Sequence, residues 1–181
     1  MQSVEWGEFN IIDIFDVKNT RNILSRDIIE NSGKTPYLCA SAENNAVSSY
    51  ISFDERYLEK GDCIFIGGKT FIVSYQEKDF YSNDSHNLVL YLKNNKKTKF
   101  VKLFFAACIN RSLGHKYSWG DSISNKKIQK DKVSLPIRNG KIDFEFMESF
   151  IADLEAERIS RVEAYLLATG LKDYTLTDEE Q

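Results

Sequence analysis

Residues 143–170 read DFEFMESFIADLEAERISRVEAYLLATG and carry the clearest structural signal in the chain. Apolar side chains recur in this stretch at steps of three and four residues, which is the periodicity of an amphipathic helix. Asp143 can cap the N-terminus of such a helix, and Gly170 can end it in a left-handed conformation. The sequence therefore predicts one helix over residues 144–169. Its apolar positions are Phe144, Met147, Ile151, Leu154, Val162, Tyr165 and Leu166.

The length of this helix limits what can cover it. At 1.5 Å per residue it is about 39 Å long, which is too long for one small domain to bury its whole apolar stripe. The segment 141–181 is also acidic, with 4 Lys/Arg against 11 Asp/Glu. We expect the stripe to pack against a helix of a second copy or of a partner, with a helix folded back on its own domain as the alternative. The side chains expected at this contact are Met147, Ile151, Leu154, Val162, Tyr165 and Leu166.

The remaining residues, 1–140, predict a globular α+β domain with a mixed, mostly antiparallel twisted sheet, followed by the helix and tail of residues 141–181. Short runs rich in β-branched and aromatic residues between polar turns indicate the strands. Ser25 can cap a short helix that ends at Gly33, and Gly67-Gly68 predicts a tight hairpin. The expected strands are 36–40, 50–53, 63–66, 71–75 and 88–92. Residues 6–17 are expected as an apolar core segment, 99–113 as a partly buried helix, 41–49 as a loop and 114–137 as a long loop with short structured pieces.

Composition predicts a globular protein that works in a reducing compartment. The hydrophobic share of 42% and the charged share of 28% are ordinary for a soluble domain. Residues 1–8 do not have the basic and then apolar character of a signal peptide, and no apolar run is long enough to cross a membrane. Cys39, Cys63 and Cys108 are odd in number and widely spaced, which favours free thiols in the cytosol over disulfides or a metal site.

A search for catalytic motifs finds none that is complete. Residues 67–70 (GGKT) imitate the end of a phosphate-binding loop, but Cys63 stands at the leading glycine position and a strand follows. An adenine methyltransferase of the usual kind needs an Asn/Asp-Pro-Pro-aromatic turn, and the two prolines, Pro36 and Pro136, are far apart. The Glu-x-Lys sequence of many metal-dependent nucleases does not occur. The sequence therefore predicts no catalytic residue, no cofactor and no metal site.

Three stretches together resemble the specificity subunits of type I restriction–modification systems, and the related subunits of some type II enzymes that cut on both sides of their site. They are WGEFNIIDIF at 6–15, YLCASAENNAVSSYI at 37–51 and LPIRNGKIDFEFME at 135–148, followed by ERI at 157–159 and TGLKDY at 169–174. The resemblance covers nearly the whole chain and depends on the order and spacing of these stretches. Ala46 stands where the family usually has glycine.

The resemblance implies a division of labour in which this chain reads DNA and other subunits do the chemistry. A target recognition domain, here residues 1–140, would read a few base pairs of double-stranded DNA, and the long helix would set the spacing between two half-sites. A methyltransferase subunit and, in some systems, a restriction subunit would be the partners. Full specificity subunits carry two such halves in tandem, whereas this chain has one half and no internal repeat. We therefore expect a homodimer through the helix and a bipartite target.

The residue types needed to bind DNA are present. Residues 93–132 hold 11 Lys/Arg and only 2 acidic residues, which favours binding of a polyanion. Lysines can neutralise phosphates, and Asn or Gln amides can pair with adenine edges. The candidate DNA-binding residues are Ser41, Asn44, Asn45, Lys69, Tyr81, Ser82, Asn83, His86, Lys116, Tyr117, Ser118, Trp119, Lys126, Lys127 and Lys130, with Asn87 and Gln129 as further amides.

Two other functions stay open on the sequence alone. One is a stand-alone nuclease or modification enzyme whose motifs are not recognised. The other is a protein-assembly module that uses only the acidic helix and has no affinity for DNA. Both are separable from a DNA reader by the behaviour of the purified chain, because an enzyme turns over alone and an assembly module does not bind duplex even at low salt.

Overall fold

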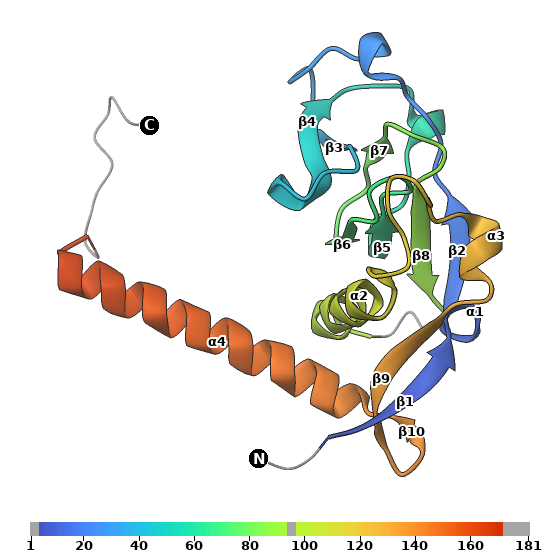
Figure 1. Ribbon diagram of the computed structural model, residues 1–181. Helices are drawn as coiled ribbons and strands as arrows, with labels where there is room; N and C mark the ends of the chain where they lie inside the picture. Colours follow the sequence, from blue (N-terminus) through green and yellow to red (C-terminus); the bar gives the residue numbers. More distant parts are fainter. Residues whose placement is uncertain (1–3, 94–96, 172–181) are drawn as a thin grey trace.

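Three small β-sheets, a buried helix and a long projecting helix make up the fold (Figure 1). The computed structural model describes residues 4–93 and 97–171. Residues 172–181, which hold the expected tail and the end of the TGLKDY stretch, lie outside the described residues. The α+β class predicted from the sequence is confirmed. Among the described residues, no helix is both long and apolar enough to cross a membrane.

The central sheet has the strand order β2-β8-β5-β6 and is antiparallel throughout. Its strands are β2 (Phe15–Asn19), β8 (Leu88–Leu92), β5 (Cys63–Ile66) and β6 (Val73–Gln76). Helix α2 (Lys99–Leu113) packs against this sheet, and the rings of Phe15 and Phe105 meet edge to face at 5.1 Å. Burial of these apolar side chains forms the main core of the domain.

Two smaller sheets flank the central one. The first has the order β4-β3-β7, with β3 (Thr35–Leu38), β4 (Val47–Ile51) and β7 (Tyr81–Ser82). Because β3 and β7 run parallel, the sheets are mixed but mostly antiparallel, as predicted. The second has the order β1-β9-β10, with β1 (Glu5–Asn10), β9 (Lys132–Arg138) and β10 (Lys141–Ile142). Short helices α1 (Ile11–Ile14) and α3 (Asn125–Ile128) and three 3-10 turns (Ser25–Asp27, Asn44–Ala46, Glu55–Tyr57) complete the domain.

Helix α4 (Phe144–Thr169) has the bounds predicted from the sequence. The Asp143 carboxylate accepts the N–H of Phe146 at 3.0 Å, and Gly170 ends the helix at a φ of 73°. The first turns of α4 pack on α2, with Met147 fully buried, while the rest of the helix projects from the domain (Figure 1). The helix is therefore not folded back along its own domain.

Three local predictions were wrong. Ser25 starts only a single 3-10 turn that ends at Asp27, so no helix reaches Ile29. The expected loop 114–137 contains most of β9, which lies between β1 and β10 and buries Val133 and Leu135. Long-range strand pairing, which local composition does not reveal, therefore decides the conformation of residues 132–137.

The third wrong prediction concerns Gly67-Gly68, which does not form a tight hairpin. A six-residue connection, 67–72, joins β5 to β6, and Phe71 rather than a glycine has a left-handed φ of 52°. A Cβ at Gly67 would collide with the side chain of Ala40, and one at Gly68 with the backbone of His86. The two glycines therefore allow neighbouring loops to approach closely.

Candidate nucleic-acid interface

Three connections that are far apart in the sequence meet at one end of the domain, and we call them the loop cluster: residues 39–46, 67–72 and 83–87. The N–H of Gly68 donates to Asn87 Oδ1 at 3.0 Å, which ties the second segment to the third. The hydroxyl of Thr70 donates to the carbonyl of Ala40 at 2.9 Å, which ties the second segment to the first. The loop cluster therefore brings candidate residues from three places together as one braced surface.

A buried polar network supports the loop cluster from below. Asn87 is 1% exposed, and its Nδ2 donates to Ser82 Oγ at 3.0 Å and to Asn83 Oδ1 at 3.2 Å. The hydroxyl of Thr20 donates to Ser82 Oγ at 2.9 Å. Ser82 and Asn87 were expected as loop residues that face DNA, but here they are buried and engaged within the protein. Ser82 and Asn87 therefore hold Asn83 and its neighbours in position.

Asp84 organises two exposed side chains of the loop cluster, those of Lys69 and His86. Lys69 Nζ lies 2.8 Å from its Oδ2, and the backbone N–H and ring Nδ1 of His86 lie 2.9 and 2.8 Å from its Oδ1. Burial raises the pKa of Asp84, but the hydrogen bonds from Lys69 and His86 outweigh it and lower the pKa to about 2. Asp84 was not among the residues predicted from the sequence. Its signal is the short polar turn in which an Asp side chain accepts the N–H two residues on.

The asparagine pair at 44–45 lies in a left-handed turn. Asn44, Asn45 and Ala46 have φ values of 46°, 52° and 67°, which asparagine and glycine tolerate better than other residues. This accounts for the glycine that the family usually has at position 46. The Nδ2 of Asn45 donates to the carbonyl of Tyr75 at 3.1 Å, so this amide also holds the turn in place.

Tyr81 and Ser41 have different environments. Tyr81 is 3% exposed and its hydroxyl donates to the carbonyl of Phe53 at 2.9 Å, so its side chain is part of the buried core. Burial also raises the pKa of Tyr81. The Ser41 hydroxyl accepts the N–H of Glu43 at 3.2 Å at the start of the turn that leads to the asparagine pair. Of these two candidates, only Ser41 lies at the surface of the loop cluster.

The connection between α2 and β9 forms a second group of candidates, which we call the tryptophan loop, residues 115–130. The Tyr117 ring packs on Phe71 of the loop cluster with centroids 5.4 Å apart. Its hydroxyl and Lys116 Nζ both reach the buried Asp131, at 2.5 and 3.1 Å. Burial and this hydrogen bond raise the pKa of Tyr117. Because Phe71 joins the two groups, the tryptophan loop adjoins the loop cluster.

The other tryptophan-loop candidates lie on an exposed turn, on α3 and in the turn that follows α3. Ser118 and Asp121 pair through their backbones around an exposed turn that carries Trp119. Lys127 contacts Asp121, whereas the structure records no ion pair for Lys126 or Lys130 among the described residues, and both are exposed. Lys126 and Lys130 are therefore the lysines here that are available for phosphate.

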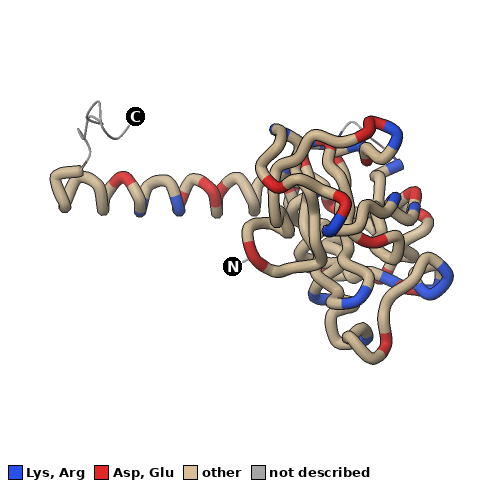
Figure 2. The backbone as a smooth tube through the Cα atoms, turned by 90° about the horizontal axis from the view of Figure 1, so that it is seen from above, with Lys and Arg blue, Asp and Glu red and all other residues tan. Residues whose placement is uncertain are grey.

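The basic character of residues 93–132 is weaker in the fold than in the sequence. Several of these cations meet carboxylates from distant segments, as in the pairs Lys102–Asp62, Lys132–Glu8 and Lys99–Glu155. Positive and negative residues alternate over the globular domain in Figure 2. The 11 Lys/Arg therefore do not form one uniform basic face. For binding phosphate, the exposed Lys126 and Lys130 matter more than the total charge of the segment.

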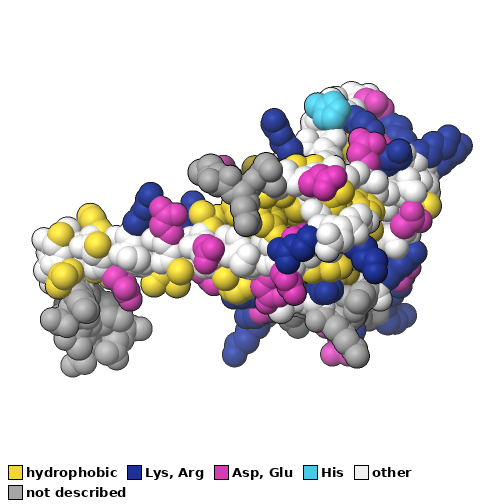
Figure 3. All heavy atoms as spheres, turned by 90° about the horizontal axis from the view of Figure 1, so that it is seen from below, with side chains coloured by type: hydrophobic (Ala, Val, Ile, Leu, Met, Phe, Trp, Pro, Cys, Tyr) yellow, Lys and Arg dark blue, Asp and Glu magenta, His cyan; other side chains and the backbone are white. Residues whose placement is uncertain are grey.

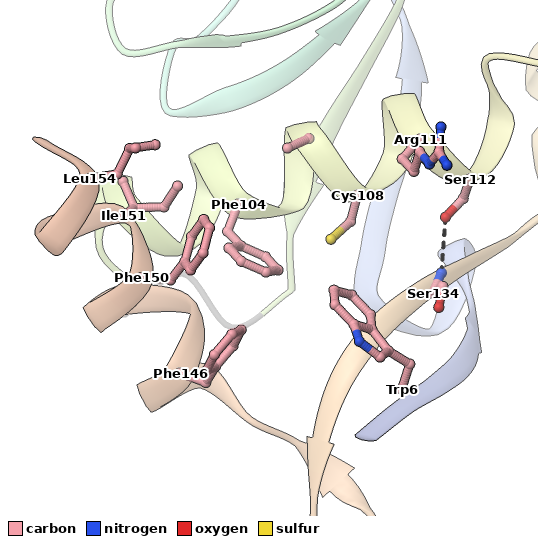
Figure 4. A pocket seen from close by; sticks show the side chains of 11 residues that line it. Trp6, Phe104, Cys108, Arg111, Ser112, Ser134, Phe146, Phe150, Ile151 and Leu154 are labelled. Carbon is pink, nitrogen blue, oxygen red and sulfur yellow. Dashed lines mark hydrogen bonds between the residues drawn. The ribbon is translucent and has the colours of Figure 1, made fainter. Parts of the chain in front are cut away.

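A separate apolar surface lies along α4. Phe150 and Leu154 are 49% and 44% exposed, and Val162 and Tyr165 are 56% and 63% exposed. Figure 3 shows hydrophobic side chains along the helix and where it joins the domain. A hollow of about 530 Å³ lies between α2, α4 and β1, and Trp6, Phe104, Phe150 and Leu154 are among its lining residues (Figure 4). Of the predicted contact residues, Met147 is buried in the domain, Ile151 and Leu166 are half-buried, and the others are exposed.

Comparison with known proteins identifies a family and a relative that match most of this chain. A family model described as the type I restriction modification DNA specificity domain matches residues 3–164. The specificity subunit S.BcgI of a type II restriction enzyme from Heyndrickxia coagulans is 22% identical over 153 residues, which are 83% of this chain and 44% of that protein.

Solved structures share the fold at low sequence identity. The S subunit of a type I restriction–modification system from M. genitalium superimposes with a TM-score of 0.60 at 16% identity, over 93% of this chain and 43% of that one. The HsdS subunit from Thermoanaerobacter tengcongensis gives a TM-score of 0.57 at 12% identity, over 88% and 39%. The chain thus spans less than half the length of the relatives that it matches.

Proposed function

Because the chain belongs to the family of type I restriction modification DNA specificity domains, we propose that it is a non-catalytic specificity subunit that reads duplex DNA in the cytoplasm. In this proposal residues 1–140 are the target recognition domain and α4 with its tail is the spacer. The observation that carries the proposal is the family match over residues 3–164. The convergence of three distant connections into one braced, exposed loop cluster supports it.

The proposed DNA surface is the loop cluster together with the tryptophan loop. Exposed lysines would neutralise phosphates and set the register, as Lys69, Lys126 and Lys130 can from their positions. Asn83 and His86 would read base edges, because both lie in the surface connection that the buried Asn87 network holds in place. A braced surface loses little conformational entropy when it binds, which favours affinity.

We also propose that two copies associate through α4 as a coiled coil, which would place two DNA-reading domains on one bipartite target. Its support is the apolar stripe that continues beyond the domain, with Leu154, Val162 and Tyr165 exposed. Exposed apolar stripes of this length are rare in proteins that stay monomeric. A methyltransferase subunit and, in some systems, a restriction subunit would bind the same assembly and supply the chemistry.

Purified wild-type chain tests this function directly. Duplex DNA should bind, and the affinity should fall steeply with salt because each phosphate contact releases counterions. The chain alone should neither cleave DNA with magnesium nor methylate it with S-adenosylmethionine. Co-expression with the methyltransferase subunit of its system should give adenine methylation at one defined sequence. Turnover by the chain alone would favour the enzyme alternative, and no duplex binding at low salt would leave only an assembly role.

A further inference from the structure

Trp119 is the most exposed large apolar side chain in the described part of the molecule, with 78% of its surface accessible. The other tryptophan differs: Trp6 is 50% exposed and its ring is stacked on Phe104 at 6.4 Å between centroids and 17° between planes. Among the described residues, no aromatic partner or cation is recorded over the Trp119 ring. Most of its indole is therefore accessible to a flat ligand.

The turn that carries Trp119 is held in place from several sides. The N–H of Ser118 donates to the carbonyl of Asp121 at 3.3 Å, and the N–H of Asp121 donates to that of Ser118 at 3.1 Å. Lys127 Nζ donates to the carbonyl of Ser122 at 2.7 Å and also contacts Asp121. On the other side Tyr117 is fixed by its contacts with Phe71 and Asp131. An exposed indole on a braced turn is preorganised for a contact outside the chain.

The surroundings of Trp119 select the kind of ligand. Lys126 and Lys130 on the same loop are exposed cations for which no ion pair is recorded among the described residues, and the turn adjoins the loop cluster through the Tyr117–Phe71 contact. A partner that offers flat π surfaces next to negative charges is a nucleic acid, because bases and phosphates alternate along it. An apolar protein groove would be a poorer match for the surrounding lysines.

We propose that Trp119 inserts its indole into the base stack of the bound duplex, next to the bases that the loop cluster reads. This inference rests on the proposed function and adds a mode of recognition to it. An aromatic wedge partly unstacks one base step, and steps that unstack easily would then be preferred without any hydrogen bond to their edges. Lys126 and Lys130 would hold the phosphates on either side.

Fluorescence provides the first test, with the duplex that wild-type chain enriches from a random 30-base-pair library as the probe. In W6F the only indole is Trp119, and in the matched W119F the only indole is Trp6. Adding the duplex should quench Trp119 and shield it from acrylamide, while the emission of Trp6 should change little. A Trp119 that stays as accessible to acrylamide in the complex as in the free protein would overturn the proposal.

Affinity and base stacking provide the second test. Base–aromatic stacking is worth about 1–3 kcal/mol, so W119A should bind the selected duplex about 5- to 150-fold more weakly, and W119F should keep most of the affinity. The salt dependence of the affinity should be the same in W119A as in wild-type chain. K126A/K130A should instead lower the slope of log affinity against log salt concentration by about one per lysine. 2-Aminopurine placed along the duplex should brighten at one step with wild-type chain and not with W119A.

The two proposals fail in different ways. If wild-type chain enriches no duplex and binds none at low salt, the DNA-reading function itself is wrong. If it binds but W119A binds equally well and leaves the 2-aminopurine response unchanged, only the wedge is wrong. Trp119 is exposed, so its replacement should not unfold the protein, and unchanged thermal unfolding of W119A would verify that.

Discussion

The loop cluster and helix α4 present candidate binding residues in opposite ways. In the loop cluster the side chains are polar and tied to one another, as Asp84 is to Lys69 and His86. On α4 beyond the domain the side chains are apolar and uncovered, as Val162 and Tyr165 are. The polar side chains of the first surface already have partners within the protein, and the surface can bind a ligand with complementary groups. The second surface exposes apolar side chains to water, which is unfavourable, so a partner that covers them would stabilise it.

This difference indicates how each surface can be disrupted. Substitutions on the exposed part of α4 should change association and leave the domain folded. Substitutions in the support of the loop cluster should change the stability of the domain itself. The first turns of α4 are an internal control, because the same helix is there part of the core.

The largest effect is expected from L154D/V162D, which places charges on the apolar stripe. In a dimer four carboxylates would enter one interface, and each buried ion costs several kcal/mol, so association should weaken by on the order of 5 kcal/mol or more. Light scattering should show a monomer with the circular dichroism of a folded domain. S160D/A164D, which adds the same charge to the opposite side of the helix, should leave a dimer. A dimer that persists in L154D/V162D would place the association surface elsewhere.

Met147 tests the packed end of the same helix. The sequence pattern places it on the same apolar stripe as Val162, yet its side chain is 0% accessible. M147A should lower the free energy of unfolding by about 2–5 kcal/mol through the lost contacts and the cavity left behind. Urea unfolding of M147A in the L154D/V162D background measures this without association. L167A, at a position 68% exposed, should change stability by about 0.5 kcal/mol or less.

Asn87 tests the support of the loop cluster. N87A leaves the buried N–H of Gly68 without its acceptor and removes one of the hydrogen bonds to the Ser82 hydroxyl. An unsatisfied buried donor costs about 1–3 kcal/mol, so unfolding should become easier by that amount. S85A, in the exposed part of the same connection, should have little effect. Equal stabilities of N87A and S85A in urea unfolding would mean that the network does not brace the surface.

The sequence predicts α4 well because its signals are local. The cap at Asp143 acts over three residues, and Gly170 sets its own φ, so both ends can be found without knowing the rest of the fold. β5 (Cys63–Ile66), β8 (Leu88–Leu92) and α2 (Lys99–Leu113) are likewise found at their predicted residues, because each strand is an apolar run and α2 contains one at residues 103–109.

The candidate site is harder to predict because its arrangement depends on distant contacts. Ser82 lies in a two-residue strand that pairs with β3, more than forty residues earlier, and nothing in its own neighbourhood indicates burial. Lys102 and Lys132 pair with Asp62 and Glu8, so their positive charges are compensated in the fold. Residue type therefore indicates which side chains can bind DNA, but long-range pairing decides which of them face outward.

The smallest effect, and the one that depends on pH, is expected at Asp84. The pKa of this carboxyl is lowered in the folded protein to about 2, so the ionised form is stabilised by folding. The resulting stability is fully present above the ordinary pKa near 4 and is lost as the pH falls from about 4 towards 2. Because each pKa unit corresponds to about 1.4 kcal/mol and Asp84 is partly exposed, D84N should cost about 1–2 kcal/mol at neutral pH.

Urea unfolding of wild-type chain and D84N between pH 7 and pH 2 measures this contribution. The two stabilities should differ at neutral pH and converge as the wild-type carboxyl is protonated. D27N, which removes an exposed carboxylate outside the loop cluster, should follow the wild-type curve. A constant difference between wild-type chain and D84N over this range would mean that Asp84 contributes through shape rather than charge. The charge of Asp84 in its contacts with Lys69 and His86 would then not be what braces the polar surface of the loop cluster, in contrast to the uncovered apolar surface of α4.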